Sequence, residues 1–161
     1  MKIKRNTPDV FIAEAVPWFM AIALFFFIFA FVGPGIFLVF EGEWLGLIFA
    51  LGGGGLGFGA MCVFVERLQL ILDTGSGHIT LRRRTILSST EDTLPLAALQ
   101  KAEVESSYTN SDNGRRRIYR PTLVLDEGDG PKFYPITEVY SSGRGADRLV
   151  RAINAWIDKR S

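Results

Sequence analysis

The chain has 161 residues and a formal net charge of +1, with 18 Lys and Arg residues against 17 Asp and Glu residues. This length accommodates about one compact domain with a few extra elements, and it argues against a multidomain enzyme. The balanced charge argues against nucleic-acid binding, which usually shows a strong basic excess, and the single cysteine, Cys62, excludes an intrachain disulfide or a cysteine-based metal site.

Residues 1–16 are predicted to form a cytoplasmic or interfacial segment. The second half of this segment places apolar side chains at helical spacing, at Phe11, Ile12, Ala15 and Val16. This spacing indicates a short helix that lies in the membrane interface before the first span.

Residues 17–40 form the first of two apolar runs. A helix of about 20 residues crosses a hydrocarbon core of about 30 Å, so this run predicts a transmembrane helix. It is too long and too rich in phenylalanine for the apolar core of a cleaved signal peptide. Pro34, between Gly33 and Gly35, removes a helical hydrogen bond and predicts a kink or a local break near Val32.

Residues 44–65 form the second apolar run, which is rich in glycine. Small residues let helices approach closely in a membrane, where the backbone must satisfy its own hydrogen bonds. Small residues at alternating spacings of four and three fall on one stripe of this helix, which predicts a packing surface for the first helix or for a neighbouring protein. The stripe consists of Gly46, Ala50, Gly53, Gly57 and Ala60.

The charged residues around the two runs predict the orientation. Glu41 and Glu43 lie in the connection, whereas basic residues precede the first run and follow the second. Because basic residues concentrate in short cytoplasmic flanks, we expect a multi-pass protein of a bacterial inner membrane with both termini cytoplasmic. The basic flanks are Lys2, Lys4 and Arg5, followed after the second run by Arg67 and Arg82 to Arg84.

Residues 66–161 change to short alternating runs, which predict a cytoplasmic domain of five or six β-strands. We expect a hairpin of residues 68–73 and 79–81, further strands at 99–107, 118–125 and 132–137, and turns at 74–77, 109–114 and 126–130. A helix over residues 144–159 should cover the sheet with one apolar face. That face comprises Leu149, Val150, Ile153, Trp156 and Ile157.

Three segments carry a resemblance to a known group of proteins: the hairpin from Leu72 to Leu81, the segment from Leu94 to Leu99 that leads into the strand of Val104, and the final helix that contains Trp156. Together with the apolar pair, they resemble bacterial two-helix membrane proteins with a pleckstrin-homology-like (PH-like) domain. The resemblance implies a membrane α-helical hairpin followed by a small α+β domain, in which an antiparallel, PH-like sheet carries a C-terminal helix. It implies interaction with other proteins and no catalytic residue.

The segment Asp73-Thr74-Gly75-Ser76 is similar to the active-site loop of aspartic peptidases, in which two aspartates share a proton. A homodimer could supply the second aspartate. The same segment, followed by Gly77, is also a good hairpin turn, because Asp starts turns and glycine accepts a positive φ. We favour the turn, with a membrane-tethered peptidase that uses Asp73 as the alternative.

His78, the only histidine, is expected to be a strand residue, because the chain offers no second imidazole or thiol cluster for a metal site. Glu103 and Glu105 alternate along a strand and share one face, which is also typical of a solvated surface. We expect no cofactor and no metal.

Two arginine runs remain, at residues 82–84 and 115–117. Arg82 and Arg84 point to one side of a strand, as do Arg115 and Arg117, so each run offers a guanidinium pair to one surface. Such pairs attract anionic headgroups near a bilayer, and they also suit phosphate or carboxylate groups of a partner protein. Solubility and membrane topology are the competing explanation.

We therefore expect a non-enzymatic integral membrane protein that serves as an accessory or assembly component of an inner-membrane complex. Its expected partners are the lipid bilayer and other membrane protein subunits. A module that binds anionic lipids through the arginine pairs is the second hypothesis, and the membrane-tethered peptidase is the third.

Overall fold

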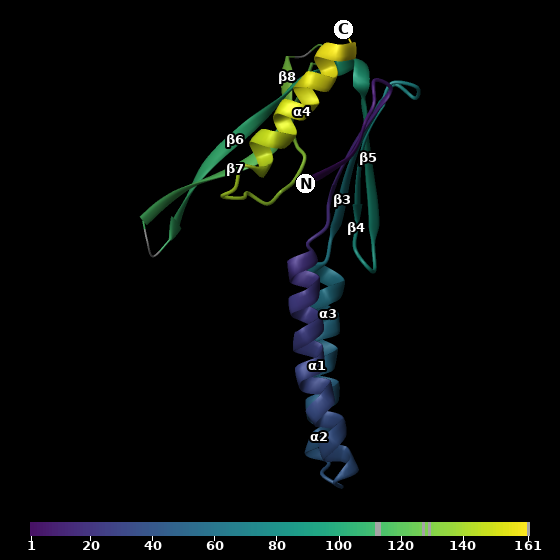
Figure 1. The fold of residues 1–161 in the computed structure, drawn as a ribbon, viewed down its shortest axis with the longest axis vertical. Coiled ribbons are helices and arrows are strands. Elements are labelled where there is room, and N and C mark those ends of the chain that lie inside the picture. Colours follow the sequence, from purple (N-terminus) through teal and green to yellow (C-terminus); the bar gives the residue numbers. More distant parts are fainter. Residues whose placement is uncertain (112–113, 127, 129, 161) are drawn as a thin grey trace. The chain divides into compact units, whose positions relative to one another are not determined.

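The structure is a computed structural model that describes residues 1–111, 114–126, 128 and 130–160. The chain divides into two compact units (Figure 1). The first unit comprises Met1–Ala15, Leu68–Arg82 and Glu91–Ser161, and is hereafter called the β unit. The second comprises Val16–Arg67 and Arg83–Thr90, and is called the helical unit.

The helical unit contains two apolar helices that are long enough to cross a membrane. The first is α1 (Trp18–Phe40). The second runs from Leu45 to Phe64 as α2 (Leu45–Ile48), a π-helical turn (Phe49–Gly53) and α3 (Gly54–Phe64). Helix α1 passes through Pro34 without interruption, so a local break near Val32 does not occur, and the alternative of a kink stays a prediction. Apolar helices tolerate proline where neighbouring groups satisfy the freed backbone.

The apolar surface of these helices is largely uncovered. In the most apolar window of each helix, 6% of the residues of α1 and 17% of those of Leu45–Phe64 are buried. The side chains of Phe19 and Leu56 are 86% and 75% exposed. The helices therefore bury mainly the residues through which they contact each other.

The first sheet of the β unit has the strand order β1-β2-β3-β4-β5 within the described residues. Its strands are β1 (Lys2–Asn6), β2 (Val10–Ala15), β3 (Arg67–Asp73), β4 (His78–Arg84) and β5 (Ser89–Pro95). The predicted hairpin of residues 68–73 and 79–81 is confirmed as β3 and β4. Strand β5 was not predicted, because its exposed, polar sequence shows no alternation.

The predicted N-terminal interfacial helix is wrong, because residues 10–15 form strand β2. Phe11 pairs with Leu72, and Ala13 pairs with Leu70 of β3. Phe11 and Ala13 are fully buried, whereas Ile12 between them is only partly buried. From Val10 to Ala13 the burial alternates with a period of two, as expected for a strand with one face on a core, and Glu14 is buried as well.

The second sheet has the order β6-β7-β8, from β6 (Leu99–Ser111), β7 (Gly114–Asp126) and β8 (Pro131–Pro135). These strands confirm the three predicted ones, but β6 and β7 are longer. Thr109 and Asn110, predicted in a turn, pair with Arg116 and Arg115. Described strands within residues 66–161 thus number six, as expected, and β1 and β2 bring the described total to eight.

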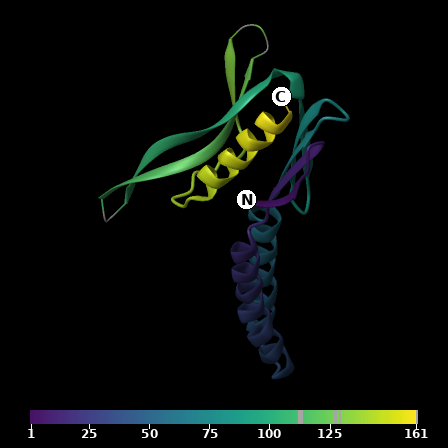
Figure 2. The same ribbon diagram turned by 45° about the horizontal axis from the view of Figure 1, so that its top comes forward.

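Helix α4 (Gly145–Arg160) confirms the predicted C-terminal helix and lies along β6 and β7 (Figure 2). Its Leu149, Ile153 and Trp156 are buried in one core with residues of both sheets. The Trp156 indole donates a 2.6 Å hydrogen bond to the Thr7 carbonyl oxygen, and its ring lies 6.3 Å from that of Phe11. The core thus ties the N-terminal strands to the C-terminal helix.

Asn154 of α4 connects the helix to the edge of the second sheet. Its side-chain oxygen accepts a 2.7 Å hydrogen bond from the Ala102 amide, and its side-chain nitrogen donates a 3.0 Å bond to the Ala102 carbonyl oxygen. These bonds satisfy backbone groups that an edge strand leaves unpaired.

Candidate functional site

The glycine stripe lies where the second apolar helix meets α1. A Cβ atom added to Gly46 would meet the Val39 nitrogen at 2.8 Å and the Gly35 oxygen, both main-chain atoms of α1. A Cβ atom at Gly57 would come within 2.5 Å of the Ile28 side chain. The glycines therefore permit a close approach of the two helices.

The remaining residues of the stripe are also shielded. Ala50 lies against Gly35 of α1, a Cβ atom at Gly53 would overlap the Phe31 side chain, and Ala60 is partly buried. By contrast, a Cβ atom at Gly52 or Gly59 would meet nothing within 4 Å. The small residues thus divide into a face that contacts α1 and a face that does not.

Asp73 starts the turn between β3 and β4. Its carboxylate accepts a 2.9 Å hydrogen bond from the Gly75 amide, and its carbonyl oxygen accepts a 3.0 Å bond from the Gly77 amide. Gly77 has a φ of +70°, which favours glycine. Hydrogen bonds from the Ser76 side chain and the Gly75 amide lower the pKa of the exposed Asp73 carboxyl. Asp73 is therefore an ionised residue with the contacts of a hairpin turn.

His78 is exposed at the start of β4, where its Nδ1 lies 2.6 Å from the Ser76 carbonyl oxygen. Across the residues that the structure describes, no group of three or more His, Cys, Asp or Glu side chains is placed to hold a metal ion. His78 therefore belongs to the same turn as Asp73.

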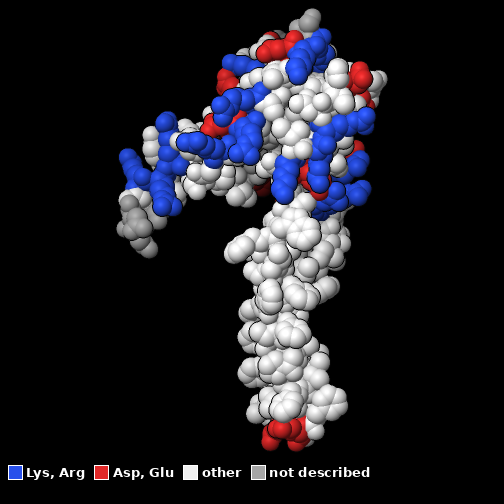
Figure 3. Space-filling model, viewed as in Figure 1, with Lys and Arg blue, Asp and Glu red and all other residues white. Residues whose placement is uncertain are grey.

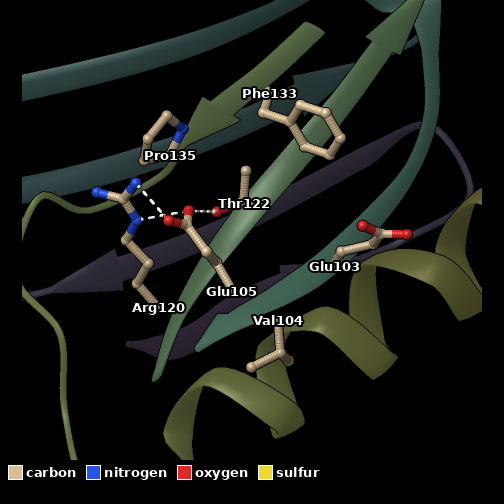
Figure 4. Close-up of a pocket in the computed structure, with 7 residues that line it drawn as sticks. All are labelled: Glu103, Val104, Glu105, Arg120, Thr122, Phe133 and Pro135. Atoms are coloured by element: carbon tan, nitrogen blue, oxygen red, sulfur yellow. Dashed lines mark hydrogen bonds and ion pairs between the residues drawn. The ribbon is translucent and has the colours of Figure 1, made fainter. Parts of the chain in front are cut away.

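A polar cluster of four hydrogen bonds surrounds Glu105 of β6 (Figure 4). Arg120 of β7 donates to both carboxylate oxygens, from Nε at 2.7 Å and from Nη2 at 2.8 Å. The Tyr140 hydroxyl donates a 2.6 Å bond, and the Thr122 hydroxyl donates a 3.2 Å bond. The Arg120 guanidinium also lies 4.6 Å from the centre of the Tyr140 ring. The cluster joins β6, β7 and the segment between β8 and α4.

These contacts determine the protonation state of the cluster. Hydrogen bonds from Arg120 and Tyr140 lower the pKa of Glu105 from its ordinary 4.5 to about 2. The hydrogen bond to Glu105 raises the pKa of Tyr140 above its ordinary value. At neutral pH the carboxylate is ionised and the phenol is protonated, so both groups hold the strands together and neither is poised to transfer a proton.

A shallow hollow of about 420 Å³ opens beside this cluster. Its lining combines the carboxylates Glu103 and Glu105 with the apolar Phe133 and Pro135 of β8 (Figure 4). Glu103 forms a 2.5 Å ion pair with Lys101. Both glutamates face this hollow, as their alternation along a strand predicted, and both are neutralised by a basic neighbour.

The first arginine run is partly neutralised within the protein. Arg82 Nε forms a 2.8 Å ion pair with Glu91 of the neighbouring β5. Arg84, two residues further along β4, is exposed and has no ion-pair partner among the described residues. Arg84 is therefore the member of the predicted pair that is available to an external anion.

The second arginine run forms an exposed cluster with an aromatic ring. Arg115 and Arg117 of β7 lie with their guanidinium carbons 5.8 and 5.6 Å from the centre of the Tyr108 ring on β6. All three residues are exposed, and Tyr108 is 61% exposed. Figure 3 shows basic side chains over the β unit, whereas the sides of the apolar helices carry no charge.

The sequence indicated Glu105 but not its partners. Arg120 lies opposite Glu105 in the β6–β7 ladder and Thr122 lies opposite Glu103, while Tyr140 follows Glu105 by 35 residues, so only the folded structure reveals the cluster. Compared with protein-family models, the chain matches none. A comparison with curated proteins likewise finds no match.

Proposed function

We propose that the chain is a non-enzymatic integral membrane protein of a bacterial inner membrane, with its helical unit in the bilayer and its β unit and both termini in the cytoplasm. We further propose that it acts as an accessory or assembly component of a membrane protein complex. The observation that carries the membrane assignment is the exposed apolar surface of α1 and Leu45–Phe64.

The low burial of these helices supports a membrane location over a place in the core of a soluble protein. The most apolar part of α1 has a mean hydropathy of 2.6. The rest of the chain would cover a core helix of this hydropathy, yet only 6% of the residues in this part of α1 are buried. Contiguous apolar patches larger than a few hundred Å² are rare on soluble monomers. In a hydrocarbon environment, the exposed apolar side chains avoid the unfavourable free energy of contact with water.

The strand order supports a hairpin that remains in the mature protein. Strand β2 ends at Ala15 and pairs with β3, so that Ala15 lies opposite Leu68. The chain thus leaves β2 for the apolar helices and returns to β3, which pairs with β2. Because β2 and β3 must lie on the same side of a membrane, the helices between them must cross it an even number of times. Cleavage after α1 would remove β1 and β2 together with the buried Phe11 and Ala13.

The part of the β unit that supports interaction with a partner is the outer half of the β6–β7 ribbon. There, residues 107–111 of β6 and 114–118 of β7 pair with each other, while β8 pairs only with residues 122–126 of β7. A two-stranded ribbon is marginally stable alone in water, and this one displays Tyr108, Arg115 and Arg117. Tyrosine and arginine are enriched in binding hot spots.

The two antiparallel sheets with a shared core and a C-terminal helix also suit the PH-like fold expected from the sequence. We propose that the β unit has a PH-like fold. PH-like architecture is compatible with binding and brings no catalytic group with it, although fold alone is an analogy and the ribbon is the more specific evidence.

Gentle detergent extraction of the full chain followed by affinity purification tests the proposal. We expect partner subunits to copurify with the chain and to be lost from the double variant Arg115→Glu and Arg117→Glu. The matched control is Arg148→Glu with Arg151→Glu, which makes the same charge change at exposed positions of α4. A chain that migrates alone under all conditions contradicts the proposal, as does equal loss of partners from both variants.

A second candidate is an anionic-lipid-binding module, which the exposed Arg84, Arg115 and Arg117 support. Amide exchange of the full chain in nanodiscs tests this candidate. Exchange at residues 114–118 should be slower in phosphatidylglycerol than in phosphatidylcholine, because these residues contact the anionic headgroups, and added salt should restore the faster exchange. Exchange that is independent of the lipid removes this candidate. Residues 66–161 alone are unsuitable for the test, because they lack β1 and β2.

A further inference from the structure

The turn between β4 and β5 has an unusual composition for its geometry. It is closed by a 2.9 Å hydrogen bond from the Thr85 amide to the Ser88 carbonyl oxygen. The Ser88 amide also donates to the Thr85 hydroxyl at 3.0 Å. The two central positions of this tight turn are occupied by Ile86 and Leu87.

Tight turns favour Gly, Asn, Asp, Pro and Ser at such positions, because these residues suit the backbone and the contact with water. Here the central side chains are aliphatic, and Ile86 is 51% and Leu87 78% exposed. The β4–β5 turn therefore exposes two aliphatic side chains, Ile86 and Leu87, which we call the tip. The hydrogen bonds between Thr85 and Ser88 close the turn behind them.

The sheet places this tip at the end where the chain arrives from α3. Strand β3 begins at Arg67, soon after α3 ends at Phe64. The short turn after Asp73 makes β3 and β4 a hairpin, so β4 ends at Arg84 at the same end of the sheet where β3 begins. Residues 83–90 accordingly belong to the same compact unit as the apolar helices.

The charge next to the tip suits a lipid surface. Arg84 immediately precedes the turn and is exposed without an ion-pair partner in the described part of the chain, whereas Arg82 is paired with Glu91. Aliphatic residues that enter the boundary between headgroups and acyl chains, flanked by a basic residue at headgroup level, are the usual pattern of an interfacial membrane contact.

We propose that the β4–β5 turn is a separate membrane contact, in which Ile86 and Leu87 insert into the interface and Arg84 binds anionic headgroups. This inference rests on the proposed membrane location of the helical unit. The contact would give the helical unit, to which residues 83–90 belong, a second attachment to the bilayer besides the helices.

Cysteine probes in lipid nanodiscs test the inference. The background is Cys62→Ser, which removes the only native thiol, and each variant carries one polarity-sensitive fluorophore, at Leu87→Cys, Val139→Cys or Phe26→Cys. Val139 is the matched control, because it is an aliphatic residue of the β unit that is 74% exposed. Phe26 is the reference for a position within α1.

We expect lipids with a shallow nitroxide to quench the Leu87 probe at least twofold more strongly than the Val139 probe, and aqueous iodide to do the reverse. Quenching by nitroxide lipid at Phe26 but not at Leu87 overturns this inference alone. Absence of quenching at all three positions overturns both the inference and the membrane assignment. A Leu87 probe shielded from iodide but not quenched by lipid indicates a protein partner and also overturns the inference.

The role of Arg84 has its own readout. Phosphatidylglycerol should increase the lipid quenching of the Leu87 probe relative to phosphatidylcholine, and Arg84→Gln should abolish this increase. Arg148→Gln on α4 is the control and should preserve it. An increase that survives Arg84→Gln shows that this arginine does not bind the headgroups.

Discussion

Substituting Gly46 by Ala tests the close approach of the two apolar helices. The new Cβ atom would lie 2.8 Å from the Val39 nitrogen and 2.9 Å from the Leu38 Cβ, and closer still to the Gly35 oxygen. Since non-bonded carbon atoms prefer separations of about 3.5–4.0 Å, the helices must separate locally by about 1 Å. The nearest atoms belong to the backbone of α1, so a change of rotamer cannot relieve the contact.

The expected cost follows from two opposing effects. Overpacking a close contact costs about 1–3 kcal/mol. The higher helix propensity of alanine returns up to about 1 kcal/mol, a value measured in water. We therefore expect Gly46→Ala to lower the free energy of unfolding by about 1–2 kcal/mol.

Denaturation of the full chain in mixed micelles, followed by circular dichroism, measures this difference. The control is Gly52→Ala, the same substitution in the same apolar helix, since a Cβ atom there meets nothing within 4 Å. Gly52→Ala should leave the midpoint unchanged or raise it. If Gly46→Ala and Gly52→Ala shift the midpoint equally, the helices do not pack through the glycine stripe.

Three further predictions concern the β unit. The pKa of Glu105 is about 2 in the folded protein, against an ordinary value of 4.5. The stability that ionised Glu105 contributes should therefore be complete above about pH 4.5 and lost as the pH falls to about 2. Glu105→Gln should remove this pH dependence of stability from acid-denaturation curves. Trp156→Phe should lower the free energy of unfolding by about 1–3 kcal/mol, because the Thr7 carbonyl oxygen loses its buried donor, and thermal denaturation that matches the wild type would contradict this. Asp73→Ala should weaken the β3–β4 turn, which should be seen as faster amide exchange of Gly75, and we expect no proteolytic activity in either the wild type or this variant. A peptidase activity of the wild type that Asp73→Ala abolishes, with amide exchange unaltered, would support the membrane-tethered peptidase instead.

Features within single segments were predictable from the sequence. The apolar runs, the stripe from Gly46 to Ala60 and the buried face of α4 each follow from spacing along one helix. The β3–β4 hairpin follows from alternation around a short turn. In each case the determining interactions join residues that are close in the chain.

The strands near the N-terminus were misassigned for the opposite reason. Residues 10–16 contain apolar positions compatible with either a helix or a strand, and the strand is selected by pairing with β3, where Val10 lies opposite Asp73. Strand β5 and the extended ends of β6 and β7 are likewise defined by neighbouring strands rather than by their own polar sequences.

The sequence by itself determined which segments are apolar enough for a bilayer, which small residues share a helix face, and where the C-terminal helix has its buried side. Only the tertiary structure decided that β1 and β2 complete the first sheet, that Arg120 and Tyr140 gather around Glu105, and that Arg82 is neutralised while Arg84 is exposed. The physical reason is the range of the interactions. Helical periodicity is a property of a single segment, whereas strand pairing and charge pairing depend on residues that folding brings together from distant parts of the chain.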